Sequence, residues 1–267
     1  MIKSISSPVN PLIKSIVTLS DKSKARKESG FFVVEGQREI LLAIKGDYKV
    51  KTIIFNPTIV TYNILHDLYG SILYETEMIE VTNLVYNKIA YREGTEGVIA
   101  IFYAKSLELS HLQLNNKLPL ILVAEAPEKP GNIGAIMRTA DAAGIDAFIV
   151  ANPNTDVYNP NIIRSSVGCV FTNQMAYGTT TDIITYLQEH KINIICATLS
   201  DYSVPYYEID FKLPTAIVVG TESTGLSEEW ISAATKNVMI PMKGQIDSIN
   251  VSVSAAILMF DAVRQRN

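Results

Sequence analysis

Short apolar runs alternate with amphipathic segments along the second half of the chain, and this alternation limits the fold more than any other feature. Apolar runs of strand length occupy residues 118–125, 145–151, 192–198, 215–220 and 237–242. Segments with helical spacing of apolar residues lie between or after these runs, at 135–143, 181–190, 227–235 and 250–264. Strands that alternate with helices form βαβ units in which the strands run parallel. The pattern therefore predicts an α/β fold with a parallel sheet.

The first third of the chain has a similar but less regular pattern. We expect helices at 10–28 and 37–45 and strands at 31–36, 51–55 and 97–103. Residues 104–117 combine polar side chains with isolated leucines, as is typical of a linker. We therefore predict two domains, a smaller α/β domain over 1–108 and a larger one over 118–267.

Composition restricts the classes of function. The 267 residues are 48% hydrophobic and 19% charged, which is typical of a globular protein with a substantial core. The net charge of −4 disfavours a polyanion partner for the chain as a whole, but residues 1–51 contain ten Lys or Arg and five Asp or Glu. No apolar run approaches the roughly 18 residues of a membrane helix, and the N-terminus lacks the apolar region of a secretory signal. Two cysteines provide no disulfide framework, so we expect a cytoplasmic protein with no membrane partner.

Several common chemistries lack the residues that they need. The segment from Gly220 to Ser227 resembles a phosphate-binding P-loop but has Leu226 in place of the lysine. No G-x-G-x-x-G motif follows a strand, and no G-x-S-x-G motif offers a serine nucleophile. The three histidines are far apart in the sequence and lack the spacing of metal ligands, so we expect no metal.

Polar loops at strand ends are the remaining candidates for chemistry. In the first loop, 130–138, Asn132 is placed to cap the following helix. Arg138 lies one helical turn after Gly134, on the same face of the predicted helix. An arginine on an amphipathic helix is most often a solvated surface residue, so this position alone does not distinguish a structural role from a functional one.

The second and third loops also admit structural interpretations. In the second loop, 220–227, Ser227 is predicted to cap a helix, whereas Glu222 has no evident structural task. In the third loop, 241–250, capping of the last helix would account for either Ser248 or Asn250. Each loop follows a buried strand, which is where open α/β sheets bind ligands.

Together, the three loops resemble the motifs of the SpoU/TrmH RNA ribose 2′-O-methyltransferases of the SPOUT superfamily. The chain reads Asn-x-Gly-x3-Arg from Asn132, Gly-x-Glu-x2-Gly-Leu-Ser from Gly220 and Ile-Pro-Met-x-Gly-x3-Ser-Ile-Asn-Val-Ser from Ile240. The segments at 7–14 and 31–36 resemble the substrate-binding domain that precedes many of these catalytic domains. The likeness thus covers nearly the whole chain.

The resemblance implies a fold, a cofactor and partners. It implies a C-terminal SPOUT domain with a trefoil knot, preceded by an RNA-binding domain, and it implies methylation of a ribose 2′-hydroxyl in ribosomal or transfer RNA. S-adenosylmethionine would be the methyl donor. A homodimer is implied as well, with a contact to which the apolar last helix could contribute; that helix could equally be core. The cofactor contacts of the family correspond to Gly220, Ile240, Met242, Ser248 and Ile249.

The resemblance also assigns catalytic roles to Arg138, Asn132, Glu222 and Asn250. Because a guanidinium stays protonated, we expect Arg138 to orient the ribose and a neighbouring phosphate, with that phosphate or a water accepting the proton. Asn132, Glu222 and Asn250 would shape the pocket, and Glu222 could also meet the sulfonium charge or accept the proton. The basic N-terminal segment would grip the RNA backbone.

Two other functions remain open from the sequence. A non-catalytic RNA-binding paralogue would keep the fold, but loss of Arg138, Glu222 or Asn250 would be expected in it, and all three are present. A binder of a small nucleotide is disfavoured by Leu226 at the P-loop lysine position.

Overall fold

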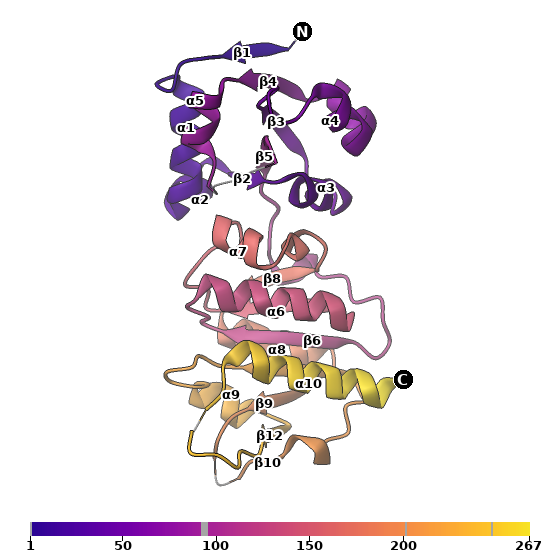
Figure 1. Cartoon of the computed structure of the whole chain (residues 1–267). Helices are drawn as coiled ribbons and strands as arrows, with labels where there is room; N and C mark the ends of the chain where they lie inside the picture. Colours follow the sequence, from indigo (N-terminus) through magenta and orange to yellow (C-terminus); the bar gives the residue numbers. More distant parts are fainter. Residues whose placement is uncertain (1, 92–95, 201, 247) are drawn as a thin grey trace. The chain divides into compact units, whose positions relative to one another are not determined.

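The computed structural model describes residues 2–91, 96–200, 202–246 and 248–267. The chain separates into two compact units, one formed by residues 1–105 and 156–172 and the other by 106–155 and 173–267. Figure 1 shows the elements of each unit.

The first unit contains a five-stranded sheet with the order β1-β4-β3-β5-β2. Strand β5 pairs antiparallel with both β3 and β2, whereas β4 pairs parallel with β1 and β3. Its strands are β1 (Lys3–Ile5), β2 (Phe31–Glu35), β3 (Val50–Phe55), β4 (Glu77–Val81) and β5 (Val98–Tyr103). Its helices are α1 (Pro11–Asp21), α2 (Ser23–Ser29), α3 (Gln37–Lys45), α4 (Tyr62–Tyr69), α5 (Asn83–Ile89) and α7 (Pro160–Ser165), with short 3-10 turns at Gly70–Tyr74 and Cys169–Phe171.

The predicted helix over 10–28 is wrong as a single element. It is divided at Lys22, whose backbone is extended, with φ −116° and ψ 111°. A seven-residue helix follows and ends at Gly30, which has φ 69° in the left-handed region that glycine tolerates. The two short helices place Arg26 in the interior of the unit, where it is 4% exposed.

Residues 156–172 belong to the first unit although they follow β7 of the second unit in the sequence. The ring of Tyr158 stacks on Phe32 with the centroids 4.2 Å apart. A Cβ on Gly46 would lie 2.1 Å from the carbonyl oxygen of Phe171, so glycine is required for this close approach. The segment is therefore packed into the first unit along its length.

The second unit contains a seven-stranded sheet with the order β10-β12-β9-β11-β6-β7-β8, and all of its pairs are parallel. Its strands are β6 (Leu120–Glu125), β7 (Ala147–Ala151), β8 (Met175–Gly178), β9 (Asn193–Ala197), β10 (Val204–Pro205), β11 (Thr215–Val219) and β12 (Lys236–Met239). Its helices are α6 (Pro130–Ala143), α8 (Thr180–Glu189), α9 (Glu228–Ala233) and α10 (Val251–Arg266), with 3-10 turns at Leu109–His111 and Tyr206–Glu208. The predicted α/β class and parallel sheet are confirmed.

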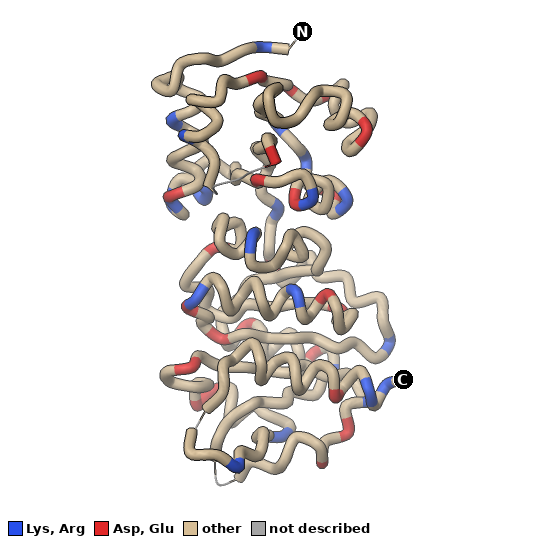
Figure 2. The backbone as a smooth tube through the Cα atoms, viewed as in Figure 1, with Lys and Arg blue, Asp and Glu red and all other residues tan. Residues whose placement is uncertain are grey.

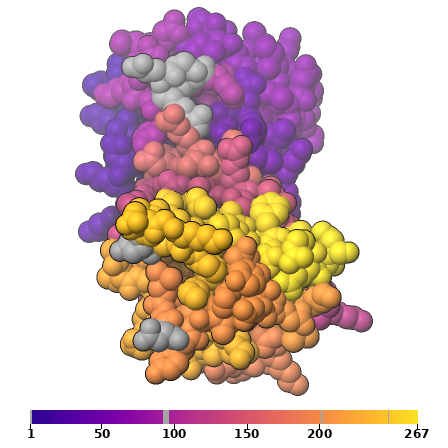
Figure 3. Space-filling model, turned by 60° about the horizontal axis from the view of Figure 1, so that its bottom comes forward, coloured from indigo at the N-terminus to yellow at the C-terminus, as the bar shows by residue number. Residues whose placement is uncertain are grey.

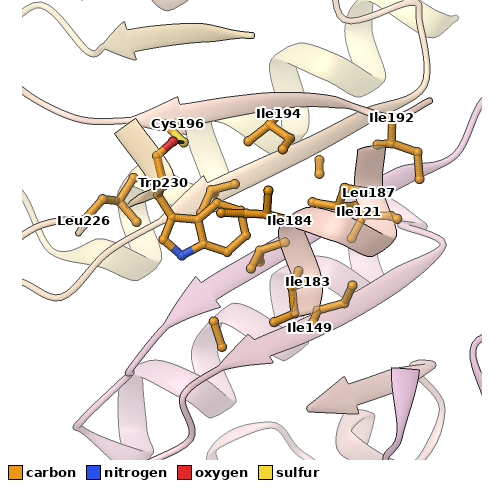
Figure 4. Packing of buried hydrophobic residues seen from close by; sticks show 14 of the residues in the cluster. Ile121, Ile149, Ile183, Ile184, Leu187, Ile192, Ile194, Cys196, Leu226 and Trp230 are labelled. Carbon is orange, nitrogen blue, oxygen red and sulfur yellow. Dashed lines mark hydrogen bonds between the residues drawn. The ribbon is translucent and has the colours of Figure 1, made fainter. Parts of the chain in front are cut away.

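Helices cover both faces of this sheet. Helices α6 and α10 pack together on one face (Figure 1). On the other face, the side chains of α8 and α9 close a core over the central strands, with Trp230 fully buried against Ile184 and Leu226 (Figure 4). The sheet is thus packed on both faces, and it fixes the positions of the polar groups at the carboxyl ends of its parallel strands.

Candidate functional site

The three motif loops meet at one edge of the second sheet. Strands β6 and β11 are parallel neighbours, with Val219 opposite Ala124, so the first and second loops leave the sheet side by side. The third loop begins after β12, two strands away from β11 in the same parallel sheet. Because parallel strands end at a common edge, residues far apart in the sequence are brought together there.

Asn132, Glu222 and Asn250 form one hydrogen-bonded cluster. The amide nitrogens of Asn132 and Asn250 donate to Oε1 of Glu222 at 3.0 and 2.8 Å. The Asn250 amide also donates to Oδ1 of Asn132 at 3.1 Å. The structure therefore joins one predicted catalytic residue from each motif.

Asn250 has two tasks at once. Its Oδ1 accepts a bond from the backbone N–H of Ser252 at 2.9 Å, which caps α10, and it accepts a second bond from the Ser252 hydroxyl. Its Nδ2 faces Glu222 and Asn132. Of the two candidates for the cap, Ser248 and Asn250, it is thus Asn250 that caps the helix, and its amide nitrogen remains available to the cluster.

Lys129 completes the cluster, although no sequence motif indicates it. Its ammonium lies 2.6 Å from Oε2 of Glu222. This contact, aided by the bond from Asn132, lowers the pKa of Glu222 below its usual range, while burial opposes the shift. In turn, the hydrogen bond to Glu222 raises the pKa of Lys129. Glu222 is thus held as a carboxylate.

The expected capping by Asn132 is wrong. Helix α6 begins at Pro130, five residues earlier than predicted, and Lys129 occupies the N-cap position. Proline is favoured in the first turn because its missing N–H has no partner there in any case. Asn132 is consequently part of the first turn of α6, where its side chain is free to point toward Glu222 rather than to cap.

Ser227 is at the predicted N-cap of α9, but its side chain does not cap the helix. Its hydroxyl instead donates to Oε1 of the buried Glu125 at 2.8 Å, and its backbone N–H donates to Oε2 at 2.8 Å. Glu125 also accepts from Thr180 at the start of α8, at 3.1 Å. This carboxylate at the end of β6 therefore anchors the second loop.

Gly220 is required by the shape of the second loop. A Cβ at this position would lie 2.2 Å from both the carbonyl carbon and the oxygen of Gly225. The loop is closed by two backbone hydrogen bonds between Thr221 and Gly225, each 3.1 Å long. The absence of a side chain at Gly220 thus allows the loop to approach itself closely.

A pocket of about 510 Å³ lies beside the cluster. Its wall includes all five residues predicted to contact a cofactor, namely Gly220, Ile240, Met242, Ser248 and Ile249. Glu222 also lines it, as do residues that were not predicted to contact a cofactor, among them Thr198, Leu199, Val219, Leu226, Val238 and Met239. In Figure 3 the C-terminal segment, gold to yellow, lies beside the orange segment that precedes β11 on this unit.

Arg138 is the one predicted catalytic residue outside the cluster. It lies in the third turn of α6 and is exposed, whereas Gly134, one turn earlier, is buried. Within the described ranges, no hydrogen bond or ion pair joins its guanidinium to another residue. Its charge is therefore available to a ligand.

The described part of the chain contains no group of three or more His, Cys, Asp or Glu side chains that could hold a metal ion. Among the described helices, none has both the length and the apolar character needed to cross a membrane.

Comparison with known proteins supports the resemblance to RNA 2′-O-methyltransferases that the motifs indicate. Residues 119–260 match the SpoU rRNA methylase family, and residues 10–100 match the MRM3-like substrate binding domain. A 23S rRNA (uridine(2479)-2′-O)-methyltransferase from Streptomyces viridochromogenes is 28% identical over 93% of this chain and 87% of its own length. A 23S rRNA (guanosine-2′-O-)-methyltransferase from Ralstonia nicotianae is 33% identical over 71% of this chain and 78% of its own.

The fold is shared with solved structures of the same class. The AdoMet-bound rRNA methyltransferase from Sinorhizobium meliloti superposes with a TM-score of 0.86 and 29% sequence identity, covering 98% of each chain. The family match spans more than half of the chain and contains all three motif loops with their common pocket. The chain therefore belongs to the SpoU rRNA methylase family.

Proposed function

We propose that this chain is an S-adenosylmethionine-dependent methyltransferase that methylates a ribose 2′-hydroxyl in ribosomal or transfer RNA. One observation carries the proposal: the motif residues Asn132, Glu222 and Asn250 form a single cluster at the rim of a pocket whose wall contains the five expected cofactor contacts. Relatives with whole-chain similarity are named as RNA 2′-O-methyltransferases, which supports the same reaction.

The pocket fits the proposed cofactor in size and chemistry. Its volume of about 510 Å³ falls within the roughly 300–1,000 Å³ of small-molecule sites. Ile240, Ile249 and Val238 offer apolar walls for an adenine ring, and the carboxylate of Glu222 offers a negative charge to a cationic ligand. When bound, S-adenosylmethionine supplies a methyl group on a positively charged sulfur.

Arg138 is proposed to orient the RNA. Its exposed guanidinium can bind a phosphate oxygen through two N–H groups and hold the adjacent 2′-hydroxyl in line for attack. Orientation of this kind reduces the barrier because the reacting atoms no longer need to be brought together from solution. The hydroxyl proton leaves to that phosphate or to a water.

Glu222 is better suited to provide charge than to accept a proton. Lys129 occupies one of its oxygens, and the amides of Asn132 and Asn250 occupy the other. These donors favour the ionised form, so the carboxylate is a weak base. We assign Glu222 the role of a fixed negative charge at the pocket rim.

The finer features of the family are part of the same proposal. We assign RNA binding to the domain over 1–108 and catalysis to 118–267, with a trefoil knot in the latter. The exposed Lys and Arg residues on α1, α2, α3 and β3, which do not include the buried Arg26, support contact with an RNA backbone (Figure 2). A homodimer is supported by the exposed side chains of Val253 and Phe260 on α10. The proposed location is the cytoplasm.

A non-catalytic RNA-binding paralogue is the second candidate, and nucleoside mass spectrometry separates the two. Cellular RNA would be compared with and without the gene, and after complementation with wild type or Arg138→Ala. We expect a 2′-O-methyl nucleoside that disappears with the gene, returns with wild type and does not return with the variant. Unchanged nucleosides in all four samples would favour the paralogue.

Calorimetry with S-adenosylmethionine tests the pocket separately. Gly220→Val should abolish measurable binding because its side chain would collide with the backbone of Gly225. Arg138→Ala serves as the control and should bind as wild type does, since Arg138 is not on the pocket wall. Tight binding by a folded Gly220→Val protein would contradict the assignment.

A further inference from the structure

Lys129 occupies a position that its helix does not favour. As the N-cap of α6, directly before Pro130, it makes no side-chain capping bond. Ser, Thr, Asp and Asn are preferred at this position, and the positive end of the helix dipole repels a cation. A residue that breaks a local rule is expected to have a compensating contact elsewhere.

That contact is with Glu222, and it holds one of the two carboxylate oxygens in place. Oε2 of Glu222 receives the Lys129 ammonium at 2.6 Å, and among the described residues no other side chain donates to this oxygen. Oε1 receives the two amides of Asn132 and Asn250. With separate donors on each oxygen, the carboxylate is held in one orientation.

The orientation of Glu222 is transmitted to the third loop through Asn250. Because Nδ2 of Asn250 donates to Glu222, its Oδ1 is directed toward Ser252 and caps α10. If the amide turned over, both interactions would be lost. The pocket wall includes Ile249 and Val251, the residues on either side of Asn250.

We infer that Lys129 is a positioning residue for the proposed methyl transfer, and that it acts through Glu222 by holding the Asn132–Glu222–Asn250 cluster and the start of α10 beside the pocket. The inference rests on the proposed function. An ion pair between exposed side chains contributes little to stability, so the effect falls on the reaction rate rather than on folding. The competing role is a direct contact between the exposed ammonium and an RNA phosphate.

Methyl transfer from labelled S-adenosylmethionine to total RNA from a strain that lacks the gene tests the inference. We expect Lys129→Met to lower the apparent kcat by on the order of tenfold or more, because small displacements at a reacting centre have large effects on rate. The KM for RNA should be unchanged. Lys129→Arg should retain most of the activity, since a guanidinium also pairs with a carboxylate. Lys117→Met, which removes an exposed lysine of the same unit, is the control for loss of charge.

A double-mutant cycle separates the two roles. If Lys129 acts through Glu222, the variants Glu222→Gln and Lys129→Met/Glu222→Gln should have equal rates, because coupled residues are not additive. If Lys129→Met lowers the rate by the same factor in both backgrounds, or reduces the salt dependence of RNA binding by about one phosphate contact, the inference is overturned in favour of RNA contact. Full activity of Lys129→Met also overturns it. If wild type binds S-adenosylmethionine but methylates no RNA, the proposed function fails instead.

Discussion

Each unit of the molecule contains an ion pair that links distant parts of the sequence, and the two pairs differ in burial. In the first unit, Arg26 and Asp156 are joined by Nη2–Oδ2 at 2.8 Å and Nε–Oδ1 at 3.1 Å, with side chains only 4% and 7% exposed. In the second unit, the side chains of Lys129 and Glu222 are 67% and 29% exposed. The buried pair is suited to stabilise the fold of the first unit, and the exposed pair is suited to position groups at the candidate site.

The chemistry of the cations explains the difference. The Arg26 guanidinium also donates to the backbone oxygens of Leu19 and Ser20, at 2.6 and 3.0 Å, so its planar group is satisfied without water. A lysine ammonium is more strongly hydrated and is better suited to an exposed position. A buried pair is costly to break because the remaining charge has no partner, whereas an exposed charge is taken up by solvent.

Loss of one member of the buried pair should have the largest effect. We expect Arg26→Met to lower the free energy of unfolding of the first unit by about 3–5 kcal/mol, because Asp156 would be left buried without a partner. Hydrogen exchange of the β2 amides under native conditions measures this change. A loss below about 1 kcal/mol, as is typical of surface ion pairs, would contradict this prediction.

Removal of both charges should be better tolerated than removal of one. In Arg26→Met/Asp156→Leu no charge remains buried, and apolar replacements of buried pairs are often neutral or stabilising. We therefore expect the double variant to recover most of the stability lost in Arg26→Met, as measured by the same exchange experiment. A double variant as unstable as the single one would show that the pair contributes geometry that apolar packing does not replace.

Loss of the exposed pair should lower activity but not stability. Lys129→Met should leave the melting temperature within experimental error of wild type, followed by circular dichroism, while methyl transfer declines. Both partners are exposed, and water replaces the lost contact. A fall in Tm comparable to that of Arg26→Met would erase the distinction between the two pairs.

The smallest effect concerns the titration of Glu222. Its pKa is lowered below the 4.5 of an ordinary glutamate, chiefly by the hydrogen bond from Lys129. A carboxyl group whose pKa is lower in the folded than in the unfolded protein stabilises the folded state at a pH above its unfolded-state pKa. This stabilisation is lost as the pH falls through the pKa of the folded state. Carboxyl ¹³C NMR should therefore show Glu222 titrating at a lower pH in wild type than in Lys129→Met. Identical curves would mean that Lys129 does not control the carboxylate.

Local pattern was sufficient for most elements but not for their ends. The strands from β6 to β12 follow from apolar runs of strand length, with the exception of the short β8 and β10. The predicted start of α6 is too late because Pro130 and Gly131 are typical of loops, although proline is well tolerated in a first turn. The break at Lys22 could not be predicted because the apolar stripe of α1 gives no sign of where the helix ends.

The candidate site likewise contains residues that the sequence indicates and one that it does not. Asn132, Glu222 and Asn250 could be named from their motifs because their side chains act at loops that follow predictable strands. Lys129 could not, because a lysine before a proline has no sequence signal until the partner carboxylate, 93 residues away, is placed next to it. Their roles as catalytic and cofactor-binding residues remain predictions.

The sequence by itself determined the α/β class, the parallel sheet and the family, because hydrophobic periodicity and motif order are local properties of the chain. The tertiary structure alone decided that Asp156 and its neighbours pack into the first unit. It also decided that the carboxylate of Glu222 is shared by a lysine and two amides. Such contacts depend on which strand ends become neighbours, and no local pattern encodes a distance between residues far apart in sequence.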